Sequence, residues 1–259
     1  MSGSGLAVDD VTVRFGGLTA VNGVTLAAPP GRITGLIGPN GAGKTTTFNV
    51  CSGLQRPTAG RVAFDGHDVT PASASARARL GLGRTFQRMQ LFDSMTVADN
   101  VALGREAGLT GGNPVRLLLP APGDARQVSD ATGAAIELCG LGRLANRRAG
   151  SLSTGERRLV ELARVLAGQF SLLLLDEPSS GLDRVETGRF GEILTRTVSE
   201  RDTGILLVEH DMALVLTVCD YIYVLEFGTL IFEGTPDEIR DSKIVRAAYL
   251  GRAAGSEVA

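Results

Sequence analysis

A short glycine-rich segment carries the residue types that hold phosphate groups. Residues 38–45 read Gly-Pro-Asn-Gly-Ala-Gly-Lys-Thr and fit the pattern G-x-x-x-x-G-K-[ST]. Glycines let backbone N–H groups converge on phosphate oxygens, and the N-terminus of a following helix adds a positive dipole end. The Lys44 ammonium can reach the β- and γ-phosphates of a nucleotide, while the Thr45 hydroxyl can bind Mg²⁺. The predicted nucleotide-binding residues are Gly38, Pro39, Asn40, Gly41, Ala42, Gly43, Lys44, Thr45 and Thr46.

The flanking patterns decide between this interpretation and a simple glycine-rich turn. Residues 33–37 form a short apolar run typical of a buried strand. Residues 44–54 have apolar side chains at helical spacing, and Gly53 is a plausible stop. A strand before the glycines and a helix after them is the context that a phosphate-binding loop requires.

Two carboxylates follow an apolar run further along the chain. Four leucines, residues 172–175, lead directly into Asp176 and Glu177. A buried strand that ends in carboxylates places them at the carboxyl edge of a sheet, where ligands bind in open α/β folds. Asp176 suits a role on Mg²⁺, and Glu177 suits the general base that activates an attacking water. Such a pair alone is more often a solvated loop, but the phosphate loop in the same chain favours the catalytic interpretation.

The surrounding pattern alternates short apolar runs with amphipathic segments. Such βαβ alternation predicts an α/β fold whose core is a mainly parallel sheet covered by helices. We expect an N-terminal antiparallel β subdomain with turns at Gly16-Gly17 and Asn22-Gly23. The expected strands cover residues 6–15, 23–28, 33–37, 61–64, 172–175 and 204–208, and the expected helices cover residues 44–54, 155–166 and 185–200.

The middle and the end of the chain differ in character. Residues 89–150 are rich in Ala, Leu, Arg and Gly, with helical patterning at 97–103 and 131–141 and a loop at 108–124. This segment predicts a helical subdomain inserted into the core. Near the C-terminus we expect a hairpin over 221–233 that turns at Phe227-Gly228, then a helix over 236–251 and a frayed tail.

Composition excludes several classes of protein. The chain has 259 residues, 43% of them hydrophobic and 21% charged, which is the balance of a globular protein. Its net charge of −2 provides no general basic field for nucleic acid. The three cysteines form no CxxC pair, so neither a zinc site nor a disulfide framework is indicated. Without a signal peptide, or an apolar run near the ~20 residues that span a bilayer, we expect a cytoplasmic protein.

Four further segments make the chain resemble the ATP-binding-cassette (ABC) ATPases. Residues 152–156, Leu-Ser-Thr-Gly-Glu, resemble the signature sequence of that family, and residues 179–183 resemble its D-loop. Gln87 resembles the Q-loop glutamine, and His210 the switch histidine. The order and spacing of these motifs match across essentially the whole chain.

The resemblance implies a role for each matched residue. Catalysis would depend on Glu177, His210, Lys44 and Gln87, with Thr45, Gln87 and Asp176 around Mg²⁺. Phe15, before Gly16-Gly17, would stack on adenine, although a core phenylalanine at a strand end is the alternative. Residues that would contact the ATP bound by a second copy are Ser153, Thr154, Gly155, Glu156 and Asp183.

The signature segment also has a purely local interpretation. Ser153-x-x-Glu156 is a capping box that opens a helix. The family consensus has Gly and Gln where this chain has Thr154 and Glu156, while Ser153 and Gly155 are retained. We therefore expect contact across a dimer to be preserved despite the changed signature.

The resemblance extends to the ATPase subunits of branched-chain amino-acid importers. It is carried by Phe-Gly-Gly-Leu-Thr-Ala-Val at 15–21, Arg-Thr-Phe-Gln at 84–87, Leu91-Phe92, Met95-Thr96-Val97 and residues 245–251. That family implies a second ATPase subunit in a homo- or heterodimer, two membrane permeases and a substrate-binding protein. The chain would then lie on the cytoplasmic face of the membrane.

Other functions within and beyond transport stay open at this point. Related ATPases that serve urea or amide import, or lipopolysaccharide export, share much of the pattern. A soluble ABC ATPase that acts on ribosomes or DNA is less favoured, because the chain has one phosphate loop and no heptad run. The intact Lys44, Asp176, Glu177 and His210 argue against a regulatory cassette that does not hydrolyse ATP.

The motifs divide the single expected ABC ATPase domain into parts. Residues 1–88 and 151–235 would form the nucleotide-binding core, and residues 89–150 the helical signature subdomain. Residues 236–259 would form a C-terminal helical extension and tail.

Overall fold

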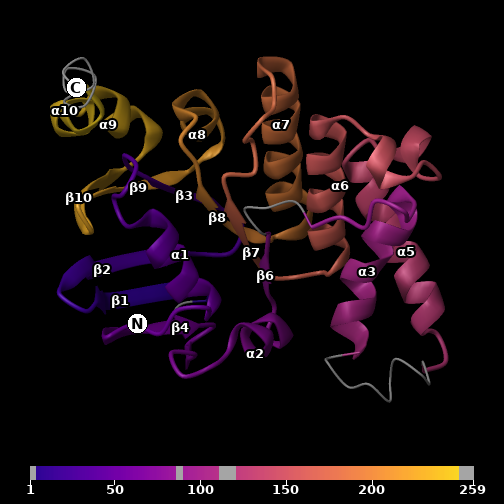
Figure 1. Ribbon diagram of the computed structural model, residues 1–259, viewed down its shortest axis with the longest axis horizontal. Coiled ribbons are helices and arrows are strands. Elements are labelled where there is room, and N and C mark those ends of the chain that lie inside the picture. Colours follow the sequence, from indigo (N-terminus) through magenta and orange to yellow (C-terminus); the bar gives the residue numbers. More distant parts are fainter. Residues whose placement is uncertain (1–3, 86–89, 111–120, 251–259) are drawn as a thin grey trace.

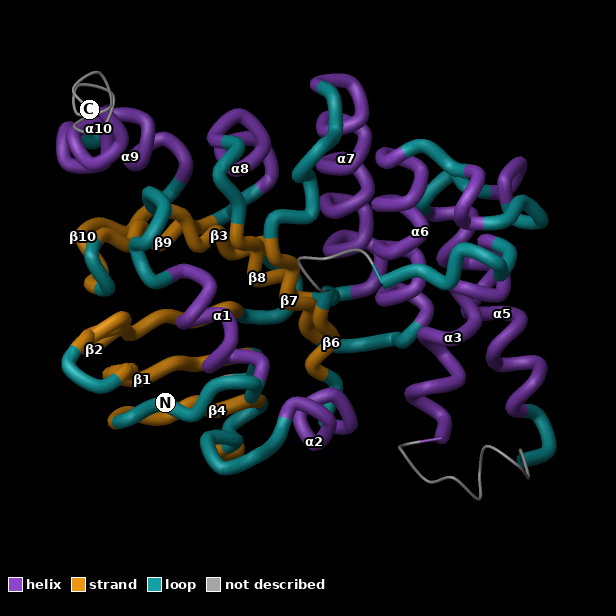
Figure 2. Tube along the Cα trace, in the orientation of Figure 1, coloured by secondary structure: helices purple, strands orange, loops and turns teal. Residues whose placement is uncertain are grey.

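Two β-sheets form the frame of the protein (Figures 1 and 2). The computed structural model describes residues 4–85, 90–110 and 121–250. An antiparallel sheet has the order β2-β1-β4-β5, and a six-stranded sheet has the order β10-β9-β3-β8-β7-β6. The strands of the first are β1 (Leu6–Phe15), β2 (Leu18–Ala28), β4 (Ala59–Phe64) and β5 (His67–Asp68). Those of the second are β3 (Ile33–Ile37), β6 (Leu82–Arg84), β7 (Leu172–Asp176), β8 (Gly204–Val208), β9 (Tyr221–Glu226) and β10 (Thr229–Gly234).

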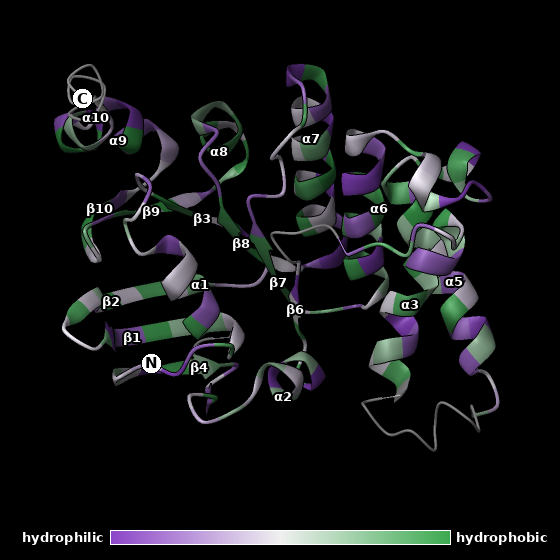
Figure 3. Ribbon diagram, viewed as in Figure 1, coloured by the Kyte–Doolittle hydropathy of each residue, from purple (hydrophilic) through white to green (hydrophobic). Residues whose placement is uncertain are grey.

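The second sheet is parallel apart from its last pair. Strands β6, β7, β8, β3 and β9 run parallel to their neighbours, whereas β9 and β10 form an antiparallel hairpin. Every residue of β3, β7 and β8 is buried. Their continuous apolar runs follow from this burial, because a parallel strand covered on both faces has no solvent side. Figure 3 shows these strands mostly in the hydrophobic colour.

Helix α1 (Lys44–Ser52) lies between the two sheets, as Figure 1 shows. Its Phe48 and Cys51 pack in one apolar cluster with Val8 of β1 and Leu206 of β8. Complete burial raises the pKa of the Cys51 thiol to about 12. Helix α1 is therefore fixed by apolar packing on both sides, and so is the loop that precedes it.

The opposite face of the parallel sheet is covered by a second group of helices. A large apolar cluster joins β7 and β8 to α6 (Thr154–Ala167), α7 (Arg184–Arg201) and α8 (Met212–Val218). Helices α3 (Val97–Thr110) and α5 (Asp124–Leu138) pack against α6. Helix α6 therefore packs both on the sheet and on these helices. The boundary at residue 150 between the helical subdomain and the nucleotide-binding core stays a prediction.

The predicted turn at Asn22-Gly23 is wrong. Both residues lie inside β2, and the hairpin between β1 and β2 turns only at Gly16-Gly17. Gly23 has a φ of 64°, and the register between β1 and β2 shifts at this point. A left-handed glycine beside a register shift is a β-bulge, which leaves the same sequence signal as a turn.

Several other boundaries differ from the predicted ones. The expected helix over 236–251 is two helices, α9 (Pro236–Asp241) and α10 (Lys243–Leu250), because Ser242 adopts an extended backbone between them. Helix α3 continues to Thr110, past the expected start of the loop at 108. The short elements β5, β6 and α2 (Ala74–Arg79), together with the 3-10 turns Gly142–Leu144 and Ala149–Ser151, have no counterpart in the sequence interpretation. Among the described helices, none is both long and apolar enough to cross a membrane.

Candidate nucleotide site

Three adjacent parallel strands deliver the predicted site residues to one edge of the sheet. The phosphate loop follows β3, Asp176 and Glu177 end or follow β7, and His210 comes shortly after β8. Strand β8 lies between β3 and β7 in the sheet. Parallel strands share one carboxyl edge, so the phosphate loop and Glu177, more than 130 positions apart in the chain, meet there.

The phosphate loop needs glycine at its closest approaches. Gly38 has a φ of 150°, and a Cβ atom there would collide with the Leu225 carbonyl oxygen. Gly43 has a φ of 98°, and a Cβ atom would lie 2.7 Å from the Ala20 carbonyl oxygen. The buried Lys44 Nζ donates hydrogen bonds to the carbonyl oxygens of Gly38, at 2.7 Å, and Pro39, at 3.2 Å. The loop is thus closed around its own ammonium group.

The N-terminus of α1 is open to an anion. Gly43 occupies the N-cap in a left-handed conformation and, as a glycine, has no side chain to accept a hydrogen bond from the first turn. The first turn also carries no acidic residue. In contrast, α6, α7 and α9 each begin with a complete capping box. Unsatisfied N–H groups at a helix N-terminus attract phosphate.

A cavity of about 530 Å³ lies over this helix end. It is bounded by the phosphate loop, the β1–β2 and β9–β10 hairpins and the carboxylate of Glu177. Its lining residues are Leu18, Thr19, Ala20, Asn40, Gly41, Ala42, Gly43, Lys44, Thr45, Thr46, Glu177 and Phe227. Asn40 to Thr46, all predicted to bind nucleotide, line it, whereas the predicted contacts Phe15, Gly38 and Pro39 do not. Phe15 pairs with Leu18 across the Gly16-Gly17 turn and is 50% exposed, so its stacking role stays a prediction.

Glu177 reaches the cavity through an unusual backbone. Its φ is 46°, a left-handed conformation that is uncommon for a residue other than glycine. The Glu177 N–H donates to the Val208 carbonyl oxygen at 2.8 Å, and its own carbonyl accepts from the Ser180 N–H at 3.1 Å. These two bonds hold the strained turn at the wall of the cavity that Glu177 lines with the phosphate loop.

Asp176 has the properties of a cation ligand. The residue is 2% exposed, and its Oδ2 atom has no hydrogen-bond partner within the described ranges. Burial, and then the neighbouring Glu177 carboxylate, raise the pKa of Asp176. A buried, unsatisfied carboxylate oxygen is costly without a cation. Together with the Thr45 hydroxyl on the phosphate loop, this atom fits Mg²⁺.

Glu209 is a site residue that the sequence interpretation missed. It is fully buried, and its Oε1 accepts a hydrogen bond from the Ser179 N–H at 2.8 Å. Its Oε2 accepts from the His210 N–H at 3.1 Å. A carboxylate after the wholly apolar strand β8 repeats the pattern that drew attention to Asp176, and it could have been found in the same way.

His210 lies beside this carboxylate rather than in the cavity. Its Nδ1 atom is 3.8 Å from Glu209 Oε2, and its side chain is 59% exposed. Gln87, predicted to be catalytic and to lie around Mg²⁺, falls outside the described residues.

The signature residues and Asp183 open two neighbouring helices. Ser153 Oγ accepts from the Glu156 N–H at 3.2 Å, and the Glu156 carboxylate accepts from the Ser153 N–H at 2.8 Å. Asp183 Oδ1 caps α7 through two backbone N–H groups, each at 2.8 Å. A Cβ atom at Gly155 would collide with the carboxylate of Glu186 in α7. A side chain at position 155 would therefore have to displace the Glu186 carboxylate, which accepts a hydrogen bond from the Asp183 N–H.

Arg158 ties the signature helix to the D-loop, and Thr154 lies close to Gly181 of that loop. A Cβ atom at Gly181 would lie 3.5 Å from Thr154 Cγ2. The buried Arg158 pairs with Glu161 at 3.2 Å, and its Nε donates to the Ser180 carbonyl at 3.4 Å. Yet none of the five predicted signature and D-loop residues lines the nucleotide cavity of its own chain.

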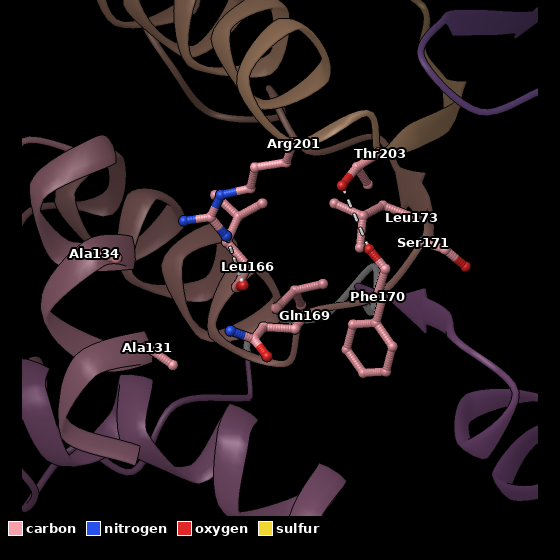
Figure 4. Close-up of a pocket in the computed structure, with 10 residues that line it drawn as sticks. Ala131, Ala134, Leu166, Gln169, Phe170, Ser171, Leu173, Arg201 and Thr203 are labelled. Atoms are coloured by element: carbon pink, nitrogen blue, oxygen red, sulfur yellow. Dashed lines mark hydrogen bonds between the residues drawn. The ribbon is translucent and has the colours of Figure 1, made fainter. Parts of the chain in front are cut away.

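A second cavity lies away from this edge, where α6 ends against β7 and the C-terminal end of α7 (Figure 4). Its volume is about 490 Å³. Arg201 spans it and donates to the Leu166 carbonyl at 3.0 Å. None of the predicted site residues is among those that line it, so it marks a joint between helices and sheet rather than the nucleotide site.

The phosphate loop, the acidic pair and the capped signature helix on this fold define an ATP-binding cassette. Comparison with known proteins agrees. Residues 21–180 match the family model described as ABC transporter, and residues 229–255 match the model described as Branched-chain amino acid ATP-binding cassette transporter. The chain belongs to the ABC transporter family, and it is the ATP-hydrolysing component that powers a transporter.

Two relatives and one solved structure illustrate the similarity. The high-affinity branched-chain amino acid transport ATP-binding protein LivG of Salmonella typhimurium is 42% identical over 96% of this chain and 98% of its own length. BraF of Pseudomonas aeruginosa, described in the same terms, is 40% identical with the same coverage. The crystal structure of an ABC transporter cassette in its ADP conformation matches 95% of this chain and 98% of its own, with a TM-score of 0.83 and 30% identity.

Proposed function

We propose that this chain drives the import of branched-chain or other amino acids, through two membrane permeases supplied by a substrate-binding protein. The observation that carries the proposal is the match of residues 229–255 to the branched-chain amino acid cassette model. That segment lies outside the part matched by the general ABC model. It therefore supports the transported substrate class independently of the ATPase motifs.

The geometry supports a division of labour in hydrolysis. The loop N–H groups and Lys44 hold the β- and γ-phosphates, and Glu177 accepts a proton from the attacking water. His210 would stabilise charge on the γ-phosphoryl oxygens, and Gln87, between the core and the helical subdomain, would couple closure of the site to the permease. Thr45 and Asp176, with Gln87 as a further predicted ligand, would hold Mg²⁺, which would supply positive charge against the developing phosphate charge.

Two copies of an ATPase subunit would complete each site. Ser153, Thr154 and Asp183 are exposed, and Gly155 and Glu156 lie beside them. Since none of them lines the cavity of its own chain, their predicted contact with ATP requires the cavity of a second subunit. Closure of the pair would expel water from the γ-phosphate.

Exposed apolar side chains support the proposal that part of the surface binds the permeases. Leu54, Leu80 and Phe92 are 56%, 54% and 56% exposed. Leu54 lines a groove beside β6, the edge strand that leads into the segment containing Gln87. Docking of a permease loop here, on the cytoplasmic face of the membrane, would couple Gln87 to transport.

The test is to capture the transporter. Tagged Glu177→Gln protein is recovered from native membranes with ATP, and its partners are identified by mass spectrometry. The matched control is Lys44→Ala, which should not trap the ATP-bound complex. Two hydrophobic permeases and an amino-acid-type binding protein would support the proposal. Ribosomal or DNA-repair proteins in their place would overturn the transport assignment.

A further inference from the structure

The tip of the β9–β10 hairpin carries an aromatic residue that turn formation does not explain. Glu226 pairs with Thr229, so Phe227 and Gly228 are the two central residues of the turn. Their φ angles are 47° and 80°. Positive φ at both positions is the type I′ pattern, which strongly favours Asn, Asp or Gly at the first position. A bulky residue in this conformation is an outlier.

Burial does not explain Phe227 either. Its side chain is 74% exposed, the second most exposed of the large apolar side chains in the described chain. An exposed phenyl group gains little from the hydrophobic effect on folding. Phenylalanine is thus unfavourable here both for the turn conformation and for an exposed position, and such residues are concentrated at functional sites.

The position of Phe227 is fixed against the phosphate loop. The Gly228 N–H donates to the Ala42 carbonyl at 3.0 Å, and the Gly228 carbonyl accepts from the Asn22 N–H at 2.8 Å. A Cβ atom at Gly228 would lie 2.7 Å from the Ala20 carbonyl oxygen. The hairpin tip is therefore clamped between the phosphate loop and β2, and it cannot move independently of either.

From this clamp Phe227 lines the nucleotide cavity together with Leu18, Thr19 and Ala20. Lys44, Thr45 and Glu177 supply the polar groups of the same cavity. The polar groups suit the phosphates, so the apolar wall of Leu18 and Phe227 is left for the nucleoside. Aromatic rings attract nucleobases by stacking and by edge contacts.

We propose that Phe227 packs on the purine base of the bound nucleotide, as an aromatic wall additional to Phe15. This proposal rests on ATP binding at the phosphate loop and is independent of the transported substrate. It predicts that Phe227 contributes to the binding of ATP and contributes nothing to the binding of tripolyphosphate, which has the same phosphates and no base.

The experiment uses intrinsic fluorescence, because the chain contains no tryptophan. Phe227→Trp introduces a single indole, whose emission a contacting purine ring quenches. We expect ATP to quench this emission and tripolyphosphate to leave it unchanged. The matched control is Leu80→Trp, at a position 54% exposed outside the cavity, where neither ligand should act. No response to ATP, or an equal response to both ligands, would overturn the base contact.

Affinity provides a second readout that guards against misfolding. Phe227→Asn suits the type I′ turn better than phenylalanine, so the hairpin should be preserved. We expect this variant to bind ATP about threefold to tenfold more weakly, the usual scale of one aromatic contact. Its affinity for tripolyphosphate should be unchanged. Phe227→Tyr, which keeps an aromatic ring, should bind ATP as the wild type does. Equal loss for both ligands would make Phe227 a support of the loop. A wild-type chain that bound neither ligand would refute nucleotide binding itself.

Discussion

The Glu209 carboxylate and the Ser179 N–H are joined by a buried hydrogen bond of 2.8 Å. Ser179 begins the D-loop, whereas Glu209 is the residue before the predicted switch histidine. Because the same carboxylate also accepts from the His210 N–H, one buried group holds the D-loop and the histidine loop in a fixed relation. A shift of either loop must break or stretch a bond to Glu209.

Glu209→Gln should therefore slow hydrolysis without weakening ATP binding. A glutamine amide has one acceptor oxygen, so its NH₂ group would face one of the two backbone donors. We expect kcat to fall about tenfold or more, because small displacements of reacting groups are costly, while the ATP Kd stays within about twofold. Steady-state phosphate release and ATP titration measure the two quantities. The exposed Glu200→Gln serves as a control, and a change in Kd alone would contradict the positioning role.

Glu177→Gln should bind ATP normally and hydrolyse it at least ~100-fold more slowly, the usual scale for losing a general base. Glutamine is nearly isosteric and leaves the backbone bonds to Val208 and Ser180 in place. Single-turnover kinetics with saturating ATP isolates the chemical step. Turnover near the wild-type rate would remove Glu177 from the role of base.

Lys44→Ala should abolish measurable nucleotide affinity, since the ammonium group lies inside the phosphate loop. The chain has only one other lysine, Lys243. Lys243→Ala is thus a matched control that removes the same charge from α10. Isothermal titration with ATP compares the two. Equal affinity in both variants would contradict the assignment of the phosphate loop.

Asp176→Asn should stabilise the ligand-free protein and abolish Mg²⁺-dependent hydrolysis. Burial raises the pKa of Asp176 above its ordinary value of 3.8. When folding raises the pKa of an acid, the acid contributes to stability at a pH below its ordinary pKa. That contribution is lost as the pH rises through the pKa of the folded state. At pH 7 the neutral asparagine avoids that loss. We therefore expect the Tm in EDTA to rise about 2–4 °C, which corresponds to a gain of about 1 kcal/mol in the free energy of unfolding. The gain should shrink as pH falls toward the ordinary pKa of 3.8, whereas a lower Tm at pH 7 would contradict the interpretation.

Ser153→Ala should affect turnover more than its structural role requires. Ser153 and Thr235 each complete a capping box, at α6 and α9 respectively. Loss of either cap should cost about 1 kcal/mol of stability. Only Ser153→Ala should also reduce the ATPase rate, because only Ser153 is predicted to contact nucleotide in a second subunit. Thermal melts and ATPase assays on both variants separate the effects, and equal rates would assign Ser153 to capping alone.

The sequence was sufficient where a pattern has a single physical cause. The phosphate loop could be predicted because glycines, lysine and a following helix leave few alternatives, and Gly38 and Gly43 indeed have no room for a side chain. The buried strands β3, β7 and β8 followed equally directly from their apolar runs.

The sequence was insufficient where two structures share one signal. Asn22-Gly23 is typical of a turn, yet the pairing of β1 with β2 continues past it and makes it a bulge. The contacts of Glu209 depend on the alignment of β7 with β8, which no local pattern encodes. Phe227 was identified only as a turn residue, because its approach to the phosphate loop depends on the Gly228–Ala42 hydrogen bond.

The left-handed backbone of Glu177 has a consequence for how this chain can evolve. Glycine or asparagine would relieve the strain, which costs about 1–3 kcal/mol for other residues. A lineage that no longer needed hydrolysis would therefore gain stability from the very substitutions that remove the general base. Cassettes of this kind that have lost catalysis should accumulate Gly or Asn here, and reversion to glutamate would then face a stability barrier as well as a genetic one.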